Sequence, residues 1–324
     1  MSEQRVYAGI DIGGTKMMCA VFEENKIIGR YKQSTNVSEG RDAMVTRLKK
    51  TVEKALKDAG IEKEVLLGIG VGCPGPLDKS TGTIVDAANL GFDNLPVKSS
   101  LEKAFSVPTV VENDVSVGTY GEFKEGAAQG YRHVLGIFPG TGLGGGIVID
   151  GKLYTGASGN AGEIGHMIMQ LDGPLCGCGQ YGCYEALASK TALSKDAVTM
   201  AFIGKAPETF DEAGTDFANF KSRIYKKGFL KDGDDTIARI VRRGAKFLGI
   251  GMGNLVNIFN PERIVLGGGL VEKLGKPYIE IAEEAMRETA MPPLLKDVTV
   301  AEALLGDDAI VIGAAALIRN EVGK

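Results

Sequence analysis

Four residues between positions 166 and 183 have the types and the spacing of a metal site. They are one of the two histidines and three of the five cysteines: His166, Cys176, Cys178 and Cys183. Three thiolates and one imidazole form the ligand set of a closed tetrahedral zinc site. The glycines between the cysteines let the backbone turn sharply enough for all four side chains to reach one ion. The spacing therefore predicts a structural Zn²⁺, and it disfavours a disulfide or inert buried cysteines.

Two glutamates flank this cluster. Glu163 precedes His166 by three residues, and Glu185 follows Cys183 by two. If zinc binds one imidazole nitrogen, the other nitrogen carries a proton and becomes a fixed hydrogen-bond donor. One donor and two carboxylate acceptors on a metal-stiffened loop suit a ligand rich in hydroxyl groups, such as a sugar. The alternative is that both glutamates are solvated surface charges.

A further carboxylate stands at the end of a predicted strand. Residues 108–111 are strand-like and run into Glu112-Asn113-Asp114, after which a helix is expected from about 115 to 127. Ligands of open α/β sheets gather outside the carboxyl ends of the strands, so Asp114 is a candidate for catalysis. The alternative is that Asp114 only caps the helix, a position that aspartate favours.

Two glycine turns repeat along the chain. Asp11-Ile-Gly-Gly-Thr-Lys16 separates predicted strands at 5–11 and 17–22, and Pro139 to Gly146 separates strands at 134–138 and 146–150. The repeat of a strand, a glycine turn and a strand predicts two similar domains. Backbone N–H groups and a threonine hydroxyl in each turn can bind phosphate oxygens. Asp11 is a candidate to hold Mg²⁺ through water, while the alternative for the first turn is an ordinary hairpin.

Two nucleotide motifs are excluded because a strand, and not a helix, comes after the glycines. A Walker A loop opens a helix, whereas the first turn lies between strands. Gly140-x-Gly142-x-x-Gly145 fits the dinucleotide pattern GxGxxG, but that pattern also needs a helix after it. The residues from Gly146 to Asp150 read as a strand, so we exclude a nicotinamide site.

The remaining elements are predicted from hydrophobic periodicity and turn residues. Gly267-Gly268-Gly269 comes after a predicted strand and leaves room for a flat group such as adenine. Gly306-Asp307-Asp308 is expected to cap the last helix. The other predicted elements are a third strand near 27–34, helices at 41–59, 235–258, 277–288 and 309–320, strands at 65–71, 264–266 and 298–301, a rigid loop at 72–78 and a polar helical region at 186–230.

Length and composition set the class of protein. The 324 residues suffice for two domains. The net charge of −4 and the lack of a lysine or arginine cluster argue against nucleic-acid binding. The sequence has no run of about 20 apolar residues, so we predict no membrane partner. Five cysteines, with Cys19 and Cys73 expected in the core, suit a reducing cytoplasm.

Taken together, these motifs resemble the ROK family of sugar kinases, and within it the bacterial ATP-dependent glucokinases. The resemblance implies an α/β fold of two similar actin/hexokinase-like (ribonuclease H-like) domains with an interdomain cleft and a zinc-binding loop. The smaller domain would comprise 1–114 plus 305–324, and the larger one 115–304. The motifs that carry the resemblance are Asp11 to Lys16, Pro74 to Asp78, Glu112 to Asp114, Gly140 to Gly146, Glu163-x-Gly-His166 and Cys176 to Glu185.

The resemblance also implies a reaction, in which ATP phosphorylates the 6-hydroxyl of a hexose, foremost glucose. Asp114 would be the catalytic base, Mg²⁺ would accompany ATP, and the family implies a homodimer. The implied sugar contacts are Asn89, Asn113, Asp114, Glu163, His166 and Glu185. The implied nucleotide contacts are Asp11, Gly13, Gly14, Thr15, Lys16, Thr141, Gly142 and Gly144, with Gly268 and Gly269 at the adenosine.

One departure from the family pattern concerns the sugar. The family usually shows Ala-Asn after the catalytic aspartate, followed by small residues and Leu-Gly-Glu. Here the residues after Asp114 include Ser116 and Tyr120. The alternatives are therefore a kinase for another hexose or N-acetylhexosamine, such as allose, fructose, N-acetylglucosamine or N-acetylmannosamine.

Two further alternatives belong to other classes of protein. The family contains sugar-sensing repressors, which carry a DNA-binding segment ahead of the kinase-like part. The present chain starts at its first strand and is acidic, which disfavours this class. A zinc-dependent hydrolase is disfavoured because such an enzyme needs an open metal position, whereas four protein ligands would fill this one.

Overall fold

The computed structural model describes residues 5–87, 91–230 and 235–323. Its internal contacts divide the chain into two compact units. Unit 1 comprises residues up to 132, 146–162 and 304–324, and unit 2 comprises 133–145 and 163–303. Helix α3 (Asp114–Glu125) packs on α11 (Ala309–Val322) and so belongs to unit 1, whereas the predicted boundary at residue 114 lies before it.

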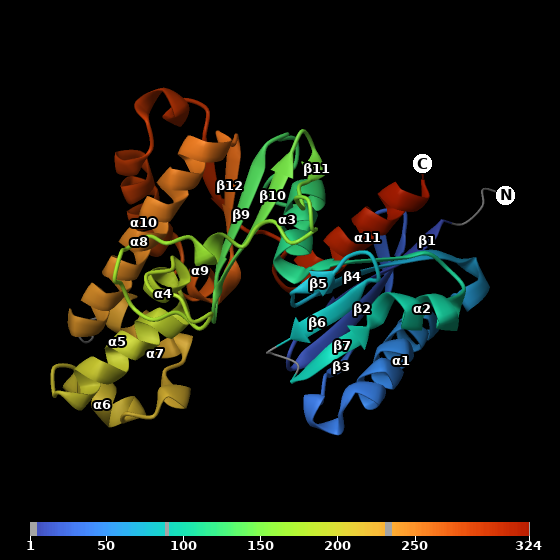
Figure 1. The fold of residues 1–324 in the computed structure, drawn as a ribbon, viewed down its shortest axis with the longest axis horizontal. Coiled ribbons are helices and arrows are strands. Elements are labelled where there is room, and N and C mark those ends of the chain that lie inside the picture. The colour runs from blue at the N-terminus through green and yellow to red at the C-terminus, as the bar shows by residue number, and fades with distance from the viewer. Residues whose placement is uncertain (1–4, 88–90, 231–234, 324) are drawn as a thin grey trace. The chain divides into compact units, whose positions relative to one another are not determined.

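Unit 1 contains a five-stranded mixed sheet. The strands occur in the order β3-β2-β1-β4-β8 (Figure 1). The pairs β1–β2 and β2–β3 are antiparallel, and β1–β4 and β4–β8 are parallel. The strands are β1 (Val6–Ile12), β2 (Lys16–Glu23), β3 (Lys26–Ser34), β4 (Leu66–Cys73) and β8 (Thr109–Asn113).

Helices cover both faces of this sheet. Helices α1 (Arg41–Ala59) and α2 (Val97–Phe105) bury apolar side chains on one face, and α11 packs on the other. Gly9 and Gly70 make the approach of α11 possible, because a Cβ atom at either position would collide with a backbone carbonyl of the helix. A small sheet of β5 (Leu77–Asp78), β6 (Thr83–Ala87) and β7 (Phe92–Pro96) completes the unit.

The second five-stranded sheet repeats the topology of the first. Its order is β11-β10-β9-β12-β13, so the hairpin β9–β10 takes the place of β1–β2. The pairs β9–β12 and β12–β13 are parallel, as β1–β4 and β4–β8 are. The repeated fold predicted from the two glycine turns is thus confirmed at the level of whole sheets. The strands are β9 (Val134–Pro139), β10 (Leu143–Ile149), β11 (Lys152–Leu153), β12 (Arg263–Leu266) and β13 (Thr299–Glu302).

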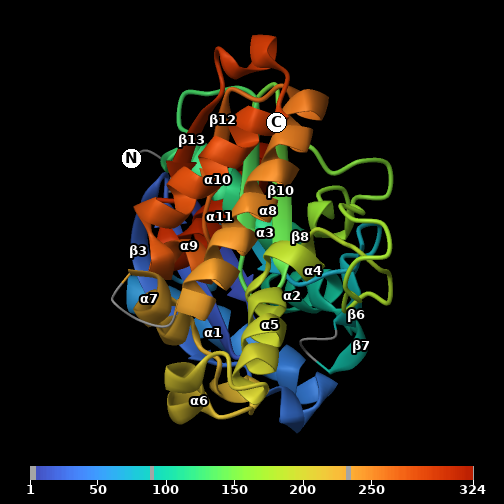
Figure 2. The same cartoon turned by 90° about the vertical axis from the view of Figure 1, so that its left-hand side faces the viewer.

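The helices of unit 2 come after the zinc loop or lie beside its strands. Helices α8 and α10 lie side by side (Figures 1 and 2). The described helices include none long and apolar enough to cross a bilayer. The helices of the unit are α4 (Glu185–Ala188), α5 (Lys190–Phe202), α6 (Pro207–Ala213), α7 (Ser222–Leu230), α8 (Asp235–Phe259), α9 (Gly268–Leu274) and α10 (Lys276–Thr289).

Most predicted elements match, and two local predictions are wrong. The predicted helix 41–59 is confirmed residue for residue. The strand predicted after the second glycine turn is also confirmed, since β10 begins at Leu143, so the helix that the dinucleotide pattern requires does not follow these glycines. The stretch at 267–269 is not an open loop, because α9 begins at Gly268. Asp308 stands at the N-cap of α11, but its carboxylate binds Arg30 by hydrogen bonds of 2.7 and 2.9 Å instead of capping the helix.

Candidate active site and metal centre

The predicted zinc ligands come together in unit 2. The ligand atoms of His166, Cys176, Cys178 and Cys183 all lie within 4.8 Å of one another. The sulfurs of Cys178 and Cys183 are 3.7 Å apart, and Cys176 Sγ lies 3.8 Å from His166 Nδ1. Two atoms bound at about 2.3 Å around a tetrahedral ion are about 3.8 Å apart. The four residues therefore fit Zn²⁺.

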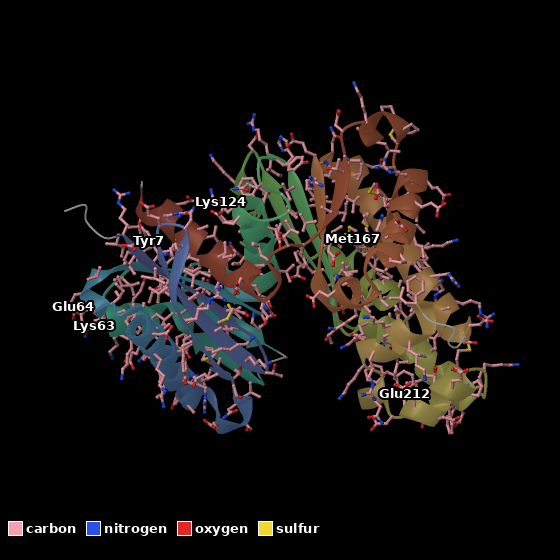
Figure 3. The ribbon with its side chains drawn as sticks, turned by 180° about the vertical axis from the view of Figure 1, so that it is seen from behind. Tyr7, Lys63, Glu64, Lys124, Met167 and Glu212 are labelled. Atoms are coloured by element: carbon pink, nitrogen blue, oxygen red, sulfur yellow. The ribbon has the colours of Figure 1, made fainter. Side chains whose placement is uncertain are left out.

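Local hydrogen bonds shape this cluster before any metal binds. The N–H of Cys176 donates to the carbonyl of Gln180 at 2.8 Å, and the N–H of Gly179 donates back to the carbonyl of Cys176 at 3.1 Å. These bonds close a tight loop around Cys178. The N–H of Tyr184 donates to the carbonyl of Met167 at 2.8 Å. Met167 comes directly after His166 and is labelled in Figure 3. The histidine and cysteine segments are thereby held side by side.

The orientation of His166 leaves one imidazole nitrogen for a ligand. Nδ1 faces Cys176, and Nε2 lies 3.9 Å from Oε2 of the exposed Glu163. That distance is too long for a direct hydrogen bond. Metal binding at Nδ1 would fix the proton on Nε2, so His166 would present a donor beside a carboxylate acceptor. A hydroxyl group can donate to one and accept from the other.

Glu185 begins α4 and is partly buried, unlike Glu163. Its Oε2 accepts a hydrogen bond of 2.9 Å from the N–H of Leu143. Its Oε1 lies 3.6 Å from Cys176 Sγ. The carboxylate is therefore placed between the zinc cluster and the second glycine turn, so it is not a freely solvated charge.

The two glycine turns leave backbone donors available. In the first turn, the N–H of Gly13 donates to Lys16, and in the second, the N–H of Gly140 donates to Gly142, both at 2.9 Å. The N–H groups of Thr141 and Gly142 make no hydrogen bond within the described part of the chain. Successive unpaired N–H groups in a turn form a site for anionic oxygens.

One threonine from outside each turn binds its carbonyls. Thr35, just after β3, donates from its N–H to Thr15 at 2.9 Å and from Oγ1 to Gly13 at 2.6 Å. Thr191, in α5, donates from its N–H to Thr141 at 3.3 Å and from Oγ1 to the same carbonyl at 2.7 Å. Both turns are thus held from their carbonyl side, which leaves their N–H groups for a ligand.

Asn113, not Asp114, caps α3. Asn113 Oδ1 accepts from the N–H groups of Val115 and Ser116 at 2.9 and 3.1 Å. Asp114 is the first helical residue, and its Oδ1 accepts from the N–H of Val115 at 2.9 Å. The alternative that Asp114 serves only as the cap is therefore wrong, because its neighbour occupies that position. The cap uses only Oδ1, so Nδ2 of Asn113 remains able to donate to a ligand.

Asp11 lies near two other carboxylates in unit 1. Burial, followed by the negative charges of Asp114 and Asp307, raises the pKa of Asp11 to about 7, and the positive charge of Lys32 opposes this rise. Lys32 binds Asp307 at 2.8 Å and, with a smaller contribution from Lys16, lowers the pKa of Asp307. The carboxylates could attract a cation here, and the lysines could attract an anionic ligand.

Sequence reasoning missed an ion pair, between Glu112 and Lys79, that lies directly beside Asn113. Glu112 is buried at the end of β8, where its carboxylate pairs with Lys79 and accepts from the N–H of Asn113 at 2.9 Å. Burial raises the pKa of Glu112, and the bond to Lys79 opposes that rise. Nothing in the sequence pairs Glu112 with Lys79, because the two residues lie on different elements. Asn89 lies outside the described residues.

Comparison with known proteins places this architecture in a family. The ROK family model matches residues 7–321. The chain belongs to the ROK family. A ROK family glucokinase from Streptomyces griseus, solved in complex with glucose and AMPPNP, is 31% identical, with a TM-score of 0.80 over 97% of this chain and 99% of that one.

A relative named as a glucokinase and a relative named as a repressor both match this chain over most of their length. A glucokinase of Halalkalibacterium halodurans is 34% identical over 98% of this chain and 96% of its own. A xylose repressor of Caldicellulosiruptor bescii is 30% identical over 97% of this chain and 78% of its own. The resemblance stated from the motifs is thus confirmed for the family, and the reaction has to be argued from the site.

We predict that this ROK protein binds about one Zn²⁺ per chain. Cys178→Ser should reduce the zinc content to a small fraction and lower the melting temperature, because binding energy at a structural zinc site is also folding energy. Elemental analysis and calorimetry measure both quantities. Cys73→Ala, which alters a buried cysteine outside the cluster, should retain the zinc. Full zinc content in Cys178→Ser would disprove the assignment.

Substitutions at Asn113 should separate its capping role from its ligand role. Asn113→Ala removes the cap and should cost about 1 kcal/mol in the free energy of unfolding. Asn113→Ser retains a capping oxygen and should keep wild-type stability. Both variants lose the Nδ2 donor and should bind sugar more weakly. Urea denaturation and calorimetric sugar titration measure the two effects, and wild-type sugar affinity in both variants would exclude Asn113 as a sugar contact.

The raised pKa of Asp11 should make stability depend on pH. Because the folded-state pKa of about 7 lies above the ordinary value of 3.8, the native state loses stability as the pH rises through this interval. Asp11→Asn cannot ionise, so it should become more stable than wild type as the pH rises, by up to about 4 kcal/mol. Urea denaturation followed by circular dichroism from about pH 4 to pH 8 measures this difference.

The control for this experiment is an exposed aspartate. Asp211→Asn, on α6, should follow the wild-type pH profile. If Asp11→Asn and wild type lose stability in parallel, Asp11 ionises near its ordinary pKa and its burial has no electrostatic consequence.

Proposed function

We propose that this protein is an ATP-dependent hexose kinase that phosphorylates the 6-hydroxyl of glucose. The observation that best supports the proposal is the orientation of His166. Its Nδ1 is turned to the cysteines and its Nε2 toward the carboxylate of Glu163, which makes a donor and acceptor pair for adjacent hydroxyls. The solved glucokinase relative holds glucose and an ATP analogue, which agrees with this use of the site.

In the proposed reaction, Asp114 is the general base. It accepts the proton of the 6-hydroxyl as the sugar oxygen forms a bond to the γ-phosphorus, and the bond from that phosphorus to the β-γ bridging oxygen breaks to release ADP. The cap formed by Asn113 fixes the start of α3, so the backbone that carries the Asp114 carboxylate has a defined position. Phosphoryl transfer depends mainly on alignment and on charge neutralisation.

The phosphates of ATP are proposed to bind the two glycine turns. The N–H groups of Thr141 and Gly142, unpaired among the described residues, would contact phosphate oxygens, and the turn from Gly13 to Lys16 is proposed as a further phosphate contact. Mg²⁺ bound to the phosphates supplies positive charge, and Asp11 would hold its water ligands. Gly268 and Gly269, at the start of α9, are proposed to lie at the adenosine.

Zinc is proposed to be structural in this enzyme. When bound, it supplies a fixed point to which the sugar-binding loop is attached. The reaction itself is assigned to the side chains of the protein.

The departures at Ser116 and Tyr120 give little support to an unusual sugar. Ser116 and Tyr120 are buried in α3. The hydroxyl of Tyr120 accepts from Nδ2 of Asn320 on α11 at 2.8 Å, and its ring lies near Phe123. Both side chains thus serve the packing of α3, so these departures do not favour another hexose or an N-acetylhexosamine over glucose.

A coupled ADP-release assay tests the proposal. Glucose should give the highest kcat/KM among glucose, mannose, allose, fructose, N-acetylglucosamine and N-acetylmannosamine. Asp114→Ala should lower kcat on glucose by about 10²–10⁴-fold, since a general base contributes an effect of that size. The variant should still fold and bind glucose, because Asn113 keeps the cap.

The outcomes distinguish the alternatives. Preference for another of these sugars would keep the kinase and change its substrate. Sugar binding with no ADP release in wild type would indicate a sensor, the class of the xylose repressor relative. Near-normal turnover in Asp114→Ala would remove Asp114 from the role of base.

For the functional domains we further propose the bounds predicted from the sequence, 1–114 with 305–324 and 115–304, except that α3, which packs on α11, is grouped with the first. A homodimer and a cytoplasmic location are also proposed. Size-exclusion chromatography with light scattering tests the first of these two, and fractionation of the source cells tests the second.

A further inference from the structure

The carboxylate of Glu185 faces two different parts of unit 2. On one side, Oε2 accepts from the N–H of Leu143, the residue directly after Gly142. On the other side, Oε1 lies 3.6 Å from Cys176 Sγ, within the zinc cluster. One side chain therefore connects the loop assigned to the sugar with the turn assigned to the phosphates.

The glycine turn is fitted closely around this carboxylate. A Cβ atom at Gly142 would collide with Oε2 of Glu185 and lie 3.2 Å from its carboxyl carbon. The backbone of Gly142 has no positive φ, so a larger residue there would not strain the backbone but would require the carboxylate of Glu185 to shift. A Cβ atom at Gly165, beside His166, would collide with the carbonyl of Leu143. The turn is thus in contact with both ends of the sugar-binding segment.

The residues after Glu185 hold the rest of the turn. The N–H of Lys190 donates to the carbonyl of Gly140 at 2.9 Å, and Thr191 donates twice to the carbonyl of Thr141. Displacement of Glu185 would therefore be transmitted to the N–H groups of Thr141 and Gly142 through short connections. Those are the groups proposed to bind the phosphates.

Oε1 of Glu185 has acceptor capacity to spare. A carboxylate oxygen can accept two hydrogen bonds, and a cysteine sulfur is at best a weak donor. No other donor contacts Oε1 among the residues that the structure describes. A sugar hydroxyl that donates to Oε1 would orient the carboxylate without disturbing the bond from Oε2 to Leu143.

We propose that Glu185 couples the two substrates, because a sugar hydroxyl on Oε1 fixes the carboxylate whose Oε2 holds the phosphate-binding turn. This inference rests on the proposed function. Bound sugar should then raise the affinity for nucleotide, and bound nucleotide should raise the affinity for sugar by the same factor. The coupling lies within unit 2 and needs no change in the chemistry of Asp114.

Two substitutions of Glu185 separate its two contacts. In Glu185→Gln, the amide oxygen can still accept from Leu143, but the amide nitrogen in place of Oε1 cannot accept from a hydroxyl. Glu185→Ala removes both contacts. Glu163→Gln is the matched control, since it alters the other flanking carboxylate, which makes no bond to the turn. Zinc content is measured for every variant to show that the metal cluster is intact.

The experiment measures the Kd of AMPPNP by calorimetry with and without saturating glucose. In wild type, glucose should lower this Kd by about 5-fold or more. Glu185→Gln should have the wild-type Kd without glucose and lose the enhancement. Glu185→Ala should bind AMPPNP more weakly even without glucose. Glu163→Gln should bind glucose more weakly and retain the enhancement once glucose is saturating.

The failures are distinguishable. If wild type binds neither glucose nor AMPPNP, the proposed function fails and this inference fails with it. If wild type binds both without enhancement, or Glu185→Gln retains the full enhancement, only the role of Glu185 is overturned. Loss of the enhancement in Glu163→Gln as well would assign the coupling to the sugar site as a whole and would also overturn it.

Discussion

The convergence of His166 and the three cysteines is the constraint on which the described site of unit 2 depends. The segment between them is held by turns and isolated bridges but exposes several apolar side chains, so its own side-chain packing restrains it little. One ion with four protein ligands would restrict the loop far more than its own packing does. Because Glu163 and Glu185 lie at the two ends of this loop, the same restriction sets the spacing of the polar groups proposed to bind the sugar.

Unit 1 positions its polar groups without a metal. Close packing of α11 on β1 and β4 at two glycines fixes the sheet, and the cap at Asn113 fixes the start of α3. Burial then brings carboxylates near one another, and the pKa of Asp11 rises to about 7. The two sets of candidate residues thus rest on different physics. Metal coordination would order a loop in unit 2, whereas packing against a rigid sheet orders strand ends in unit 1.

Local sequence patterns predicted most of the candidate site residues. The partners of these residues could not be predicted, because they come from distant parts of the sequence. The zinc ligands, the glycine turns and Asp114 are recognised from neighbours in the sequence. Asp307 is 275 residues from Lys32, and Glu112 is 33 residues from Lys79, so neither partner could be read from a window. Asn113 and Asp114 are both good capping residues, and only the backbone decides which one caps. At Gly268, low helix propensity concealed α9.

The duplicated sheets show why the second glycine turn depends on the zinc loop. In the first sheet, β3 has nine residues and leads directly into Thr35, whose N–H and hydroxyl both bind carbonyls of the first turn. The matching strand β11 has two residues and ends far short of its turn. Thr191, from the helix that comes after the zinc loop, makes the equivalent bonds. The short strand in one repeat thus leaves its turn to be held by a segment whose own position a metal ion would fix, and Glu185 lies at that junction.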